Sequence, residues 1–328
     1  MVATRGFSDQ LFVLGALNYL DEDFDINDMG YLEENNKISL GGFLQYINPI
    51  KNENSKVSQT IFRVNGGHNR STEGYSSGIG LNTELEFFMR DNSYISLKCD
   101  CTVMRGKNFT ETRNFVDAPF IESLAKYNLQ LAYYSPRTNK IRPYVKFGLG
   151  TDGYRSNDPS IDLQSESAKL GAGLILTTST QLRASLNFFE YQKQNNWSIW
   201  QEDNLFGYFE KEMISSGIDI DWFPGTNQEF RLKAFIYGIR ASDARAFRVN
   251  ASGFMTAAID DLNEFQLSEV AFQVRYKYEF SPLSNLYVVY TRGGKSSGAL
   301  SDSFGNLYSN AWNEQTTDKF IVKIRYKF

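Results

Sequence analysis

Hydrophobic and polar residues alternate with a period of two along most of the chain. In residues 270–280 the even positions are hydrophobic, whereas Gln273, Arg275 and Lys277 occupy odd positions. The last segment, residues 318–328, repeats this pattern. Because successive side chains of a β-strand point to opposite faces, the alternation predicts strands that have one apolar and one polar face.

The same pattern predicts about 14 antiparallel strands, within a range of roughly 12 to 18. It recurs in residues 11–20, 37–47, 58–67, 79–87, 93–104, 127–133, 141–149, 165–177, 182–188, 214–222, 228–240 and 284–292. Because no window of about ten or more residues shows a clear period of 3.6, we expect helices to be few and short.

Short and long connections alternate along the chain. The short ones are residues 90–92, 135–139, 177–179, 223–227 and 281–282, and the long ones are 21–36, 66–77, 105–123, 152–164, 192–206, 241–265 and 293–317. Outer-membrane barrels have this asymmetry, with short periplasmic turns and long external loops. We therefore interpret residues 1–328 as one domain, an all-β transmembrane antiparallel barrel in the outer membrane of a diderm bacterium.

The composition excludes several other classes of protein. The chain of 328 residues is 41% hydrophobic and 22% charged, which is too apolar for a disordered protein. A net charge of −4 gives no basic surface for nucleic acid. No stretch approaches about 18 consecutive apolar residues, so a helical membrane protein is excluded. A soluble β-sandwich, with one face of its strands in a dry core, is the alternative.

The two ends of the chain carry different signals. The N-terminal segment lacks the apolar run and cleavage site of a secretory signal, so we expect the chain to be the C-terminal part of a longer precursor. At the other end, Val322, Ile324, Tyr326 and the terminal Phe328 alternate along a final strand. This ending resembles the signal by which barrel-assembly machinery recognises outer-membrane barrels. An ordinary edge strand is the alternative interpretation.

Charged residues occupy the polar positions of the predicted strands, and in a barrel these positions face the lumen. The candidate lumen-lining residues are Arg142, Lys146, Arg183, Arg231, Lys233, Arg275, Lys277, Lys323, Arg325, Glu84, Glu86, Asp219 and Asp221. Such residues can tune the selectivity of a pore. They can equally form structural ion pairs that close a narrow barrel, and the sequence leaves both readings open.

Residues that could carry chemistry are sparse. His68 is the only histidine, and no nucleophile, base and orienting group can be assembled around it, so we expect neither an enzyme nor a cofactor. Asp21, Asp23 and Asp25 have the spacing of the first ligands of a calcium loop, but the later positions of an EF-hand lack the required Gly and Glu. They are the one calcium candidate, and we otherwise expect no metal.

Three segments resemble a known family of largely uncharacterised bacterial proteins: 23–32, 222–240 and 274–291. Full-length members of that family carry an N-terminal domain similar to carbohydrate-binding family 9, followed by a C-terminal outer-membrane barrel. The matching positions are Asp25, Asp28, Gly30, Tyr31, Trp222, Phe223, Arg231, Tyr276, Pro282 and Tyr290. The resemblance implies that this chain is the barrel region and that these positions serve architecture rather than chemistry.

The leading functional hypothesis is therefore a porin- or channel-like barrel, with a link to glycan or small-solute uptake that rests on the family resemblance alone. The alternative is a non-conducting barrel that anchors or scaffolds a partner complex or the carbohydrate-binding-like domain. In either case the expected partners are the lipid bilayer, lipopolysaccharide, the barrel-assembly machinery and outer-membrane partner subunits, with no nucleic acid.

Overall fold

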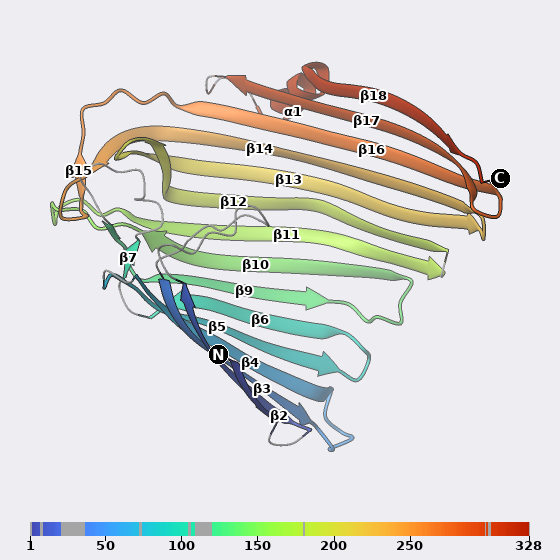
Figure 1. The fold of residues 1–328 in the computed structure, drawn as a ribbon, viewed down its shortest axis with the longest axis horizontal. Coiled ribbons are helices and arrows are strands. Elements are labelled where there is room, and N and C mark those ends of the chain that lie inside the picture. The colour runs from blue at the N-terminus through green and yellow to red at the C-terminus, as the bar shows by residue number, and fades with distance from the viewer. Residues whose placement is uncertain are drawn as a thin grey trace.

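The computed structural model describes residues 2–6, 9–20, 37–71, 74–103, 106–108, 120–179, 181–298, 300 and 303–327, and within these residues it is dominated by one 16-stranded antiparallel sheet (Figure 1). In spatial order its strands are β1 (Val2–Gly6), β2 (Leu11–Leu20), β3 (Lys37–Pro49), β4 (Val57–Ser71), β5 (Ser76–Met89), β6 (Tyr94–Thr102), β9 (Lys126–Tyr134), β10 (Ile141–Gly153), β11 (Gln164–Ser179), β12 (Leu182–Glu202), β13 (Leu205–Gly225), β14 (Gln228–Val249), β16 (Phe265–Ser281), β17 (Ser284–Gly298) and β18 (Gln315–Arg325). The short β15 (Met255–Ala257) pairs with β14, while β7 (Lys107–Asn108) and β8 (Ile121–Glu122) form a separate two-stranded sheet.

All 14 predicted segments are strands of this sheet, and their order in space is their order along the chain. Four of the predicted long connections are wrong in part. Residues 66–77 are mostly strand, because β4 continues to Ser71 and β5 begins at Ser76. Residues 293–317 begin with six more residues of β17 and contain a helix at 304–313. Residues 192–206 are mostly strand, because β12 and β13 continue to a tight turn at 203–204. The connection 241–265 begins with nine more residues of β14 and later includes β15. The strands extend beyond their apolar segments, and the polar side chains in these extensions lack the alternation from which strands were predicted.

The sheet separates apolar from polar side chains. Leu131 pairs with Phe147, and Phe147 pairs with Leu170 on the next strand. All three are more than 40% exposed, as are many other large hydrophobic side chains on this face. The opposite face carries most of the charged side chains, although the Arg292–Asp318 ion pair lies on the apolar face. Slipping any strand by one residue would exchange its two faces, so the alternation fixes the register as well as the strands.

The sheet is open within the described residues. β1 pairs with β2 and β18 pairs with β17, and neither end strand has a second neighbour there. In Figure 1 the blue N-terminal strands and the red C-terminal strands accordingly lie at opposite ends of the sheet. The sequence predicts the two faces correctly, but the closed barrel is not present in this structure. Closure depends on the register of the first strand against the last, about which alternation says nothing.

A helix, α1 (Phe304–Asn313), lies against the apolar face near the long-loop ends of β14, β16 and β17. Ser303 caps its first turn by accepting a hydrogen bond from the Asn306 amide, and Leu307 and Ala311 are buried against the sheet. One ten-residue helix in the described part of the chain agrees with the prediction of few, short helices, although the sequence analysis did not locate it. No helix in the described part of the chain is long and apolar enough to cross a membrane.

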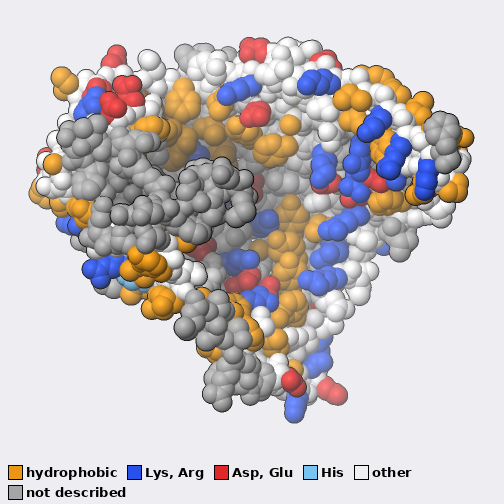
Figure 2. Space-filling view, in the orientation of Figure 1, with side chains coloured by type: hydrophobic (Ala, Val, Ile, Leu, Met, Phe, Trp, Pro, Cys, Tyr) orange, Lys and Arg blue, Asp and Glu red, His pale blue; other side chains and the backbone are white. Residues whose placement is uncertain are grey.

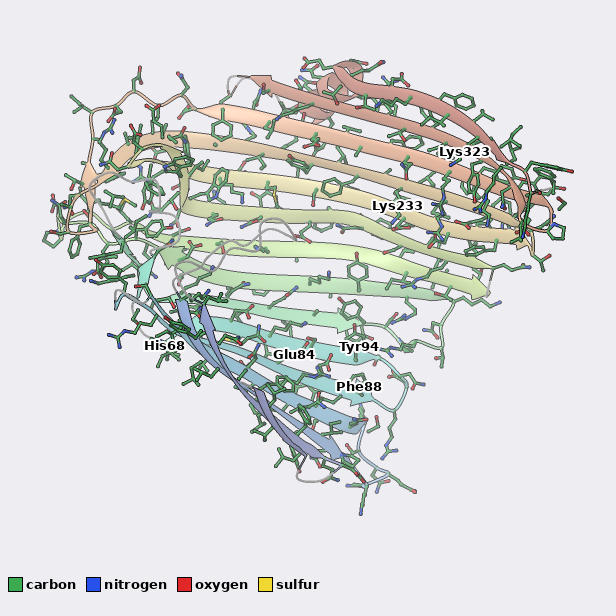
Figure 3. All side chains as sticks on the ribbon, in the orientation of Figure 1. His68, Glu84, Phe88, Tyr94, Lys233 and Lys323 are labelled. Carbon is green, nitrogen blue, oxygen red and sulfur yellow. The ribbon has the colours of Figure 1, made fainter. Side chains whose placement is uncertain are left out.

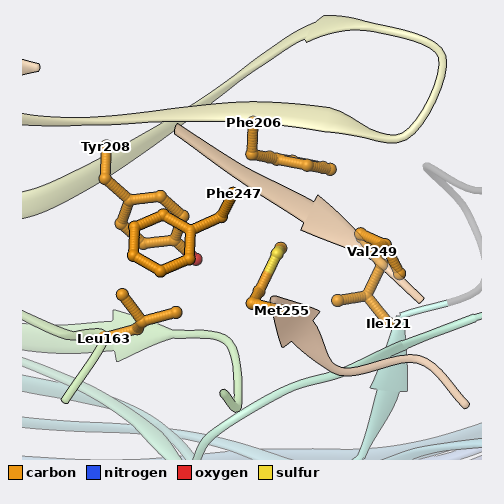
Figure 4. Close-up of a cluster of buried hydrophobic side chains, with 7 residues drawn as sticks. All are labelled: Ile121, Leu163, Phe206, Tyr208, Phe247, Val249 and Met255. Atoms are coloured by element: carbon orange, nitrogen blue, oxygen red, sulfur yellow. The ribbon is translucent and has the colours of Figure 1, made fainter. Parts of the chain in front are cut away.

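The strands of the long hairpins rise beyond the apolar region and end in a small hydrophobic cluster. β12, β13 and β14 have 21, 21 and 22 residues. At about 3.3 Å per residue each spans about 70 Å, more than twice the roughly 30 Å hydrocarbon core of a bilayer. The ends of β13 and β14 meet β8, β15 and the segment before β11 in a cluster that we call the cap (Figure 4). It consists of Ile121, Leu163, Phe206, Tyr208, Phe247, Val249 and Met255.

Candidate functional site: the polar face of the sheet

The polar face of the sheet is hollowed, and Lys, Arg, Asp and Glu side chains gather in and beside the hollow (Figure 2). Strand register places all thirteen predicted lumen-lining residues on this face. Glu84, Lys233 and Lys323, which lie on strands far apart in the sequence, are labelled in Figure 3. The structure thus brings the predicted residues to one surface, although that surface does not enclose a lumen here.

A first ion-pair network joins β4, β5 and β6. Arg63 Nη1 lies 3.0 Å from Glu84 Oε2 and 2.7 Å from Glu86 Oε2, and its Nε donates to Gln45 Oε1 at 2.9 Å. Lys98 Nζ approaches the other Glu84 oxygen at 2.8 Å. Four charged side chains from three strands thereby compensate one another. Arg63 and Lys98 are functional candidates that the sequence analysis missed, although both occupy polar positions of predicted strands.

A second network joins β13, β14 and β16. Glu229 accepts a hydrogen bond from Arg275 and forms an ion pair with Arg231, and Arg231 Nε also lies 3.1 Å from Asp221 Oδ1. Separately, Lys233 Nζ lies 3.1 Å from Asp219 Oδ2. All these side chains are partly exposed, so each pair contributes only about 0–1 kcal/mol to stability. Their more important effect is on the electrostatic potential over the polar face.

A row of aromatic rings crosses the polar face at the short-turn end. Tyr94 stacks on Tyr134 with ring centroids 4.5 Å apart and planes 6° apart, and Phe88 and Tyr144 extend the row at 5.8 and 5.5 Å. The next strand provides Gly173, where a Cβ would lie 2.5 Å from the Tyr144 hydroxyl. The rings contact one another mainly through their faces, so the row stiffens the sheet and leaves edges for contact with solvent.

Two hollows open on this face, one over the N-terminal strands and one over the C-terminal strands. One, of about 670 Å³, spans β12 to β18, and its lining includes Asn187, Lys233, Phe235, Gln273 and Thr317. The other, of about 560 Å³, spans β2 to β9 and is lined by neutral amides and an acid, among them Asn18, Asn65, Asn82 and Asp100. Both hollows are large enough for small polar solutes.

A bidentate ion pair between Arg248 and Asp260 stabilises the cap. Arg248 on β14 donates to Asp260 through Nη2 at 2.7 Å and through Nε at 3.1 Å, and its Nη1 donates to Asn204 Oδ1 at 3.0 Å. The hydrogen bonds from Arg248 hold the pKa of the Asp260 carboxyl below its usual value. The pair therefore ties residues 258–264 to the end of β14.

Acid should loosen the cap. Because the pKa of Asp260 is lowered by folding, its contribution to stability is complete above its unfolded pKa of about 3.9 and is lost as the pH falls through the lowered folded value. We expect protection of the Val249 amide, which donates to Asn204 O at 2.9 Å, to fall below about pH 4. Hydrogen exchange corrected for the intrinsic rate measures this. Asp260→Asn should show weaker protection at neutral pH and a smaller acid effect, and equal acid sensitivity in both proteins would contradict the assignment.

Some predicted residues lie outside the described residues. These are the calcium candidates Asp21, Asp23 and Asp25, the family-matching positions Asp28, Gly30 and Tyr31, and the terminal Phe328. Val322 and Ile324 are exposed on the apolar side of β18, and Tyr326, just beyond the end of this strand, is also exposed. Among the described residues, no group of three or more His, Cys, Asp or Glu side chains could hold a metal ion. His68 contacts the Gly78 carbonyl oxygen through Nδ1 at 2.9 Å.

Comparison with known families identifies the relatives of this two-faced sheet. A family model described as a domain of unknown function, DUF5916, matches residues 7–328. The chain belongs to the DUF5916 family. The match extends over the whole strand order from β2 to β18, so the polar face and the cap both lie within the family domain. A search of curated proteins finds no match to the DUF5916 chain.

Proposed function

We propose that this DUF5916 chain is a transmembrane β barrel of a diderm outer membrane, and that it conducts small solutes along its polar face. The observation that carries the proposal is the exposed apolar face, with side chains such as Leu129, Leu149 and Ile324 at alternate positions opposite a charged, hollowed face. An outer-membrane barrel needs this arrangement, with lipid on one side and water on the other.

Lipid is the cover that best fits the apolar face. Exposed apolar patches on soluble monomers rarely exceed a few hundred Å². Here the exposed hydrophobic side chains extend from Leu17 on β2 to Ile324 on β18, and in the described part of the chain α1 covers only the region near β14, β16 and β17. A soluble sandwich would require a second apolar layer over this whole surface.

Membrane insertion would also require closure of the sheet. The free backbone groups at the edges of β1 and β18 would each cost several kcal/mol in hydrocarbon. We therefore propose that the two edges are satisfied in the membrane, by each other or by further strands. The alternating Val322, Ile324, Tyr326 and Phe328 would serve as the recognition signal for barrel-assembly machinery, and the apolar face would contact lipid and lipopolysaccharide.

The cap favours a second candidate, a barrel that does not conduct. Its buried side chains bring five separate segments together at the long-loop end, where a pore would have its outer mouth. A barrel closed there would act as an anchor or scaffold for partner subunits or for the carbohydrate-binding-like domain of longer relatives. If the barrel conducts, the same resemblance suggests small glycan-derived solutes as its cargo.

Conductance in a planar bilayer separates the two candidates. The chain would be purified in detergent, and its folding would first be checked from the difference in electrophoretic mobility between unboiled and boiled samples. We expect steady ohmic steps from the folded protein. Lack of conductance by correctly inserted barrels would overturn the channel proposal in favour of the anchor, and failure to insert at all would overturn both.

A further inference from the structure

We infer that the polar face of the C-terminal strands is a binding lane for small anions bearing phosphate or carboxylate groups. The inference rests on the proposed function and gives the class of solute. The polar positions of β14, β16, β17 and β18 carry eight cations but three carboxylates. The cations are Arg231, Lys233, Arg275, Lys277, Lys295, Lys319, Lys323 and Arg325, and the carboxylates are Glu229, Glu269 and Glu279.

The carboxylates near these strands are already engaged elsewhere. Glu229 is shared by Arg231 and Arg275, and the neighbouring Asp219 and Asp221 of β13 pair with Lys233 and Arg231. Glu269 accepts from the Tyr237 hydroxyl at 2.8 Å, and Glu279 Oε1 accepts from the Leu283 amide at 3.2 Å.

Five of these cations form no ion pair among the described residues. One of them, Lys295, pairs in register with Glu269 nearer the long-loop end, and the other four lie closer to the short-turn end. We call Lys277, Lys319, Lys323 and Arg325 the basic lane. Lys277 pairs in register with Glu229 of the second network. Glu229 already holds two guanidinium groups, so it cannot neutralise Lys277 as well.

The register of β16, β17 and β18 places the cations of the basic lane close together on one face. Lys277 and Lys323 both pair with Tyr287, one from each side, so they lie two strand spacings apart, about 9.6 Å between their backbones. Lys319, Lys323 and Arg325 are all on the same face of β18, because the residues between them alternate. Two strands, β16 and β18, thus place positive charge on one stretch of the polar face, on either side of β17. Lys323 of this stretch is labelled in Figure 3.

The excess is local and does not follow from the overall charge. The whole chain carries a net charge of −4. On β4, β5 and β6 the polar face is nearly balanced, with Arg63 and Lys98 set against Glu84, Glu86 and Asp100. A surface with one sign of charge concentrates the opposite ion, and Arg and Lys are the usual binders of phosphate and carboxylate.

The test measures ion selectivity and anion binding on the same protein. In a potassium chloride gradient we expect the wild-type channel to prefer chloride, and inorganic phosphate to reduce its chloride current. The triple variant K277Q/K323Q/R325Q should lose most of both effects. The control K51Q/K56Q/K140Q removes the same charge from the exposed short-turn end and should keep both. Cation preference in the wild type, or equal effects of the two triple variants, would overturn the inference.

A binding measurement keeps this result separate from the channel proposal. Tripolyphosphate binding to the detergent-solubilised folded protein, followed by calorimetry at several salt concentrations, requires no conductance. Binding that weakens with salt and is lost in K277Q/K323Q/R325Q would support the basic lane even if bilayers stay silent, in which case the channel proposal alone fails. Absence of binding by the folded wild-type protein would overturn the lane itself.

Discussion

Replacing Phe247 with alanine should open the cap while leaving the rest of the sheet folded. Phe247 is buried among the cap residues and meets the Tyr208 ring edge-on at 5.0 Å between centroids. Losing a buried phenyl group costs about 3–5 kcal/mol. The Met255 amide donates to Arg155 O at 2.8 Å. Because the lower end of this energy range, about 3 kcal/mol, corresponds to about 100-fold in an equilibrium constant, we expect the protection of this amide from hydrogen exchange to fall by about 100-fold or more.

Ile259, in the connection that follows β15, provides a matched control. Ile259 is fully exposed, so Ile259→Ala removes a large aliphatic side chain from the same end without touching the cluster. Amides in β9 and β10, such as that of Phe147, should keep their protection in both variants, because these strands lie away from the cap contacts. If Phe247→Ala left Met255 protection unchanged, or loosened β9 and β10 equally, the cap would not be a separate unit. In bilayers the open cap should also raise conductance several-fold.

Gly294→Ala should displace α1 from the apolar face. A Cβ at this position would lie 1.7 Å from the backbone oxygen of Ala311, so the helix cannot stay where it is. Overpacking of this kind costs about 1–3 kcal/mol, and moving the helix also exposes Leu307. We expect lower stability of the folded protein in urea titrations, together with faster exchange of the Leu307 amide, which donates to Ser303 O at 3.0 Å.

The neighbouring glycine makes this experiment specific. Gly293 points to the other face, where a Cβ would meet its nearest atom, Thr316 Oγ1, at 3.4 Å. Gly293→Ala changes the backbone propensity of β17 in the same way without touching α1. Similar urea midpoints for the two variants would show that the close approach of α1 to the strand is not what Gly294 provides.

The fold could be read from the sequence where period and face agree. Every predicted strand is present, because alternation of apolar and polar residues with a period of two fits a β-strand and does not fit a helix. The helix was missed even though Phe304, Leu307, Tyr308 and Ala311 have the i, i+3, i+4 and i+7 spacing of one helical face. That spacing extends over only ten residues inside a polar connection, so it was not sufficient to predict a helix. Its docking on the apolar face depends on Gly238 and Gly294, which are far apart in the sequence.

The sequence predicts which face of the sheet each charged residue occupies, but not which charged residues form ion pairs with one another. Alternation assigns each charge to a face, and all thirteen predicted residues do lie on the polar face. Which charges compensate one another depends on cross-strand register, which brings Arg63 opposite Glu84 and leaves Lys323 opposite Tyr287. The aromatic row from Phe88 to Tyr144 likewise exists only once four strands are aligned.

Alternating water and lipid accessibility along β9 tests the central claim most directly. Single cysteines would replace Asn128, Leu129, Gln130 and Leu131 in a chain whose Cys99 and Cys101 are serine, and the folded protein would be placed in lipid vesicles. We predict that positions 128 and 130 react with a charged, water-soluble thiol reagent, while fluorophores at 129 and 131 are quenched by brominated lipid. Uniform water reactivity at all four positions, without lipid quenching, would contradict a membrane-spanning barrel wall.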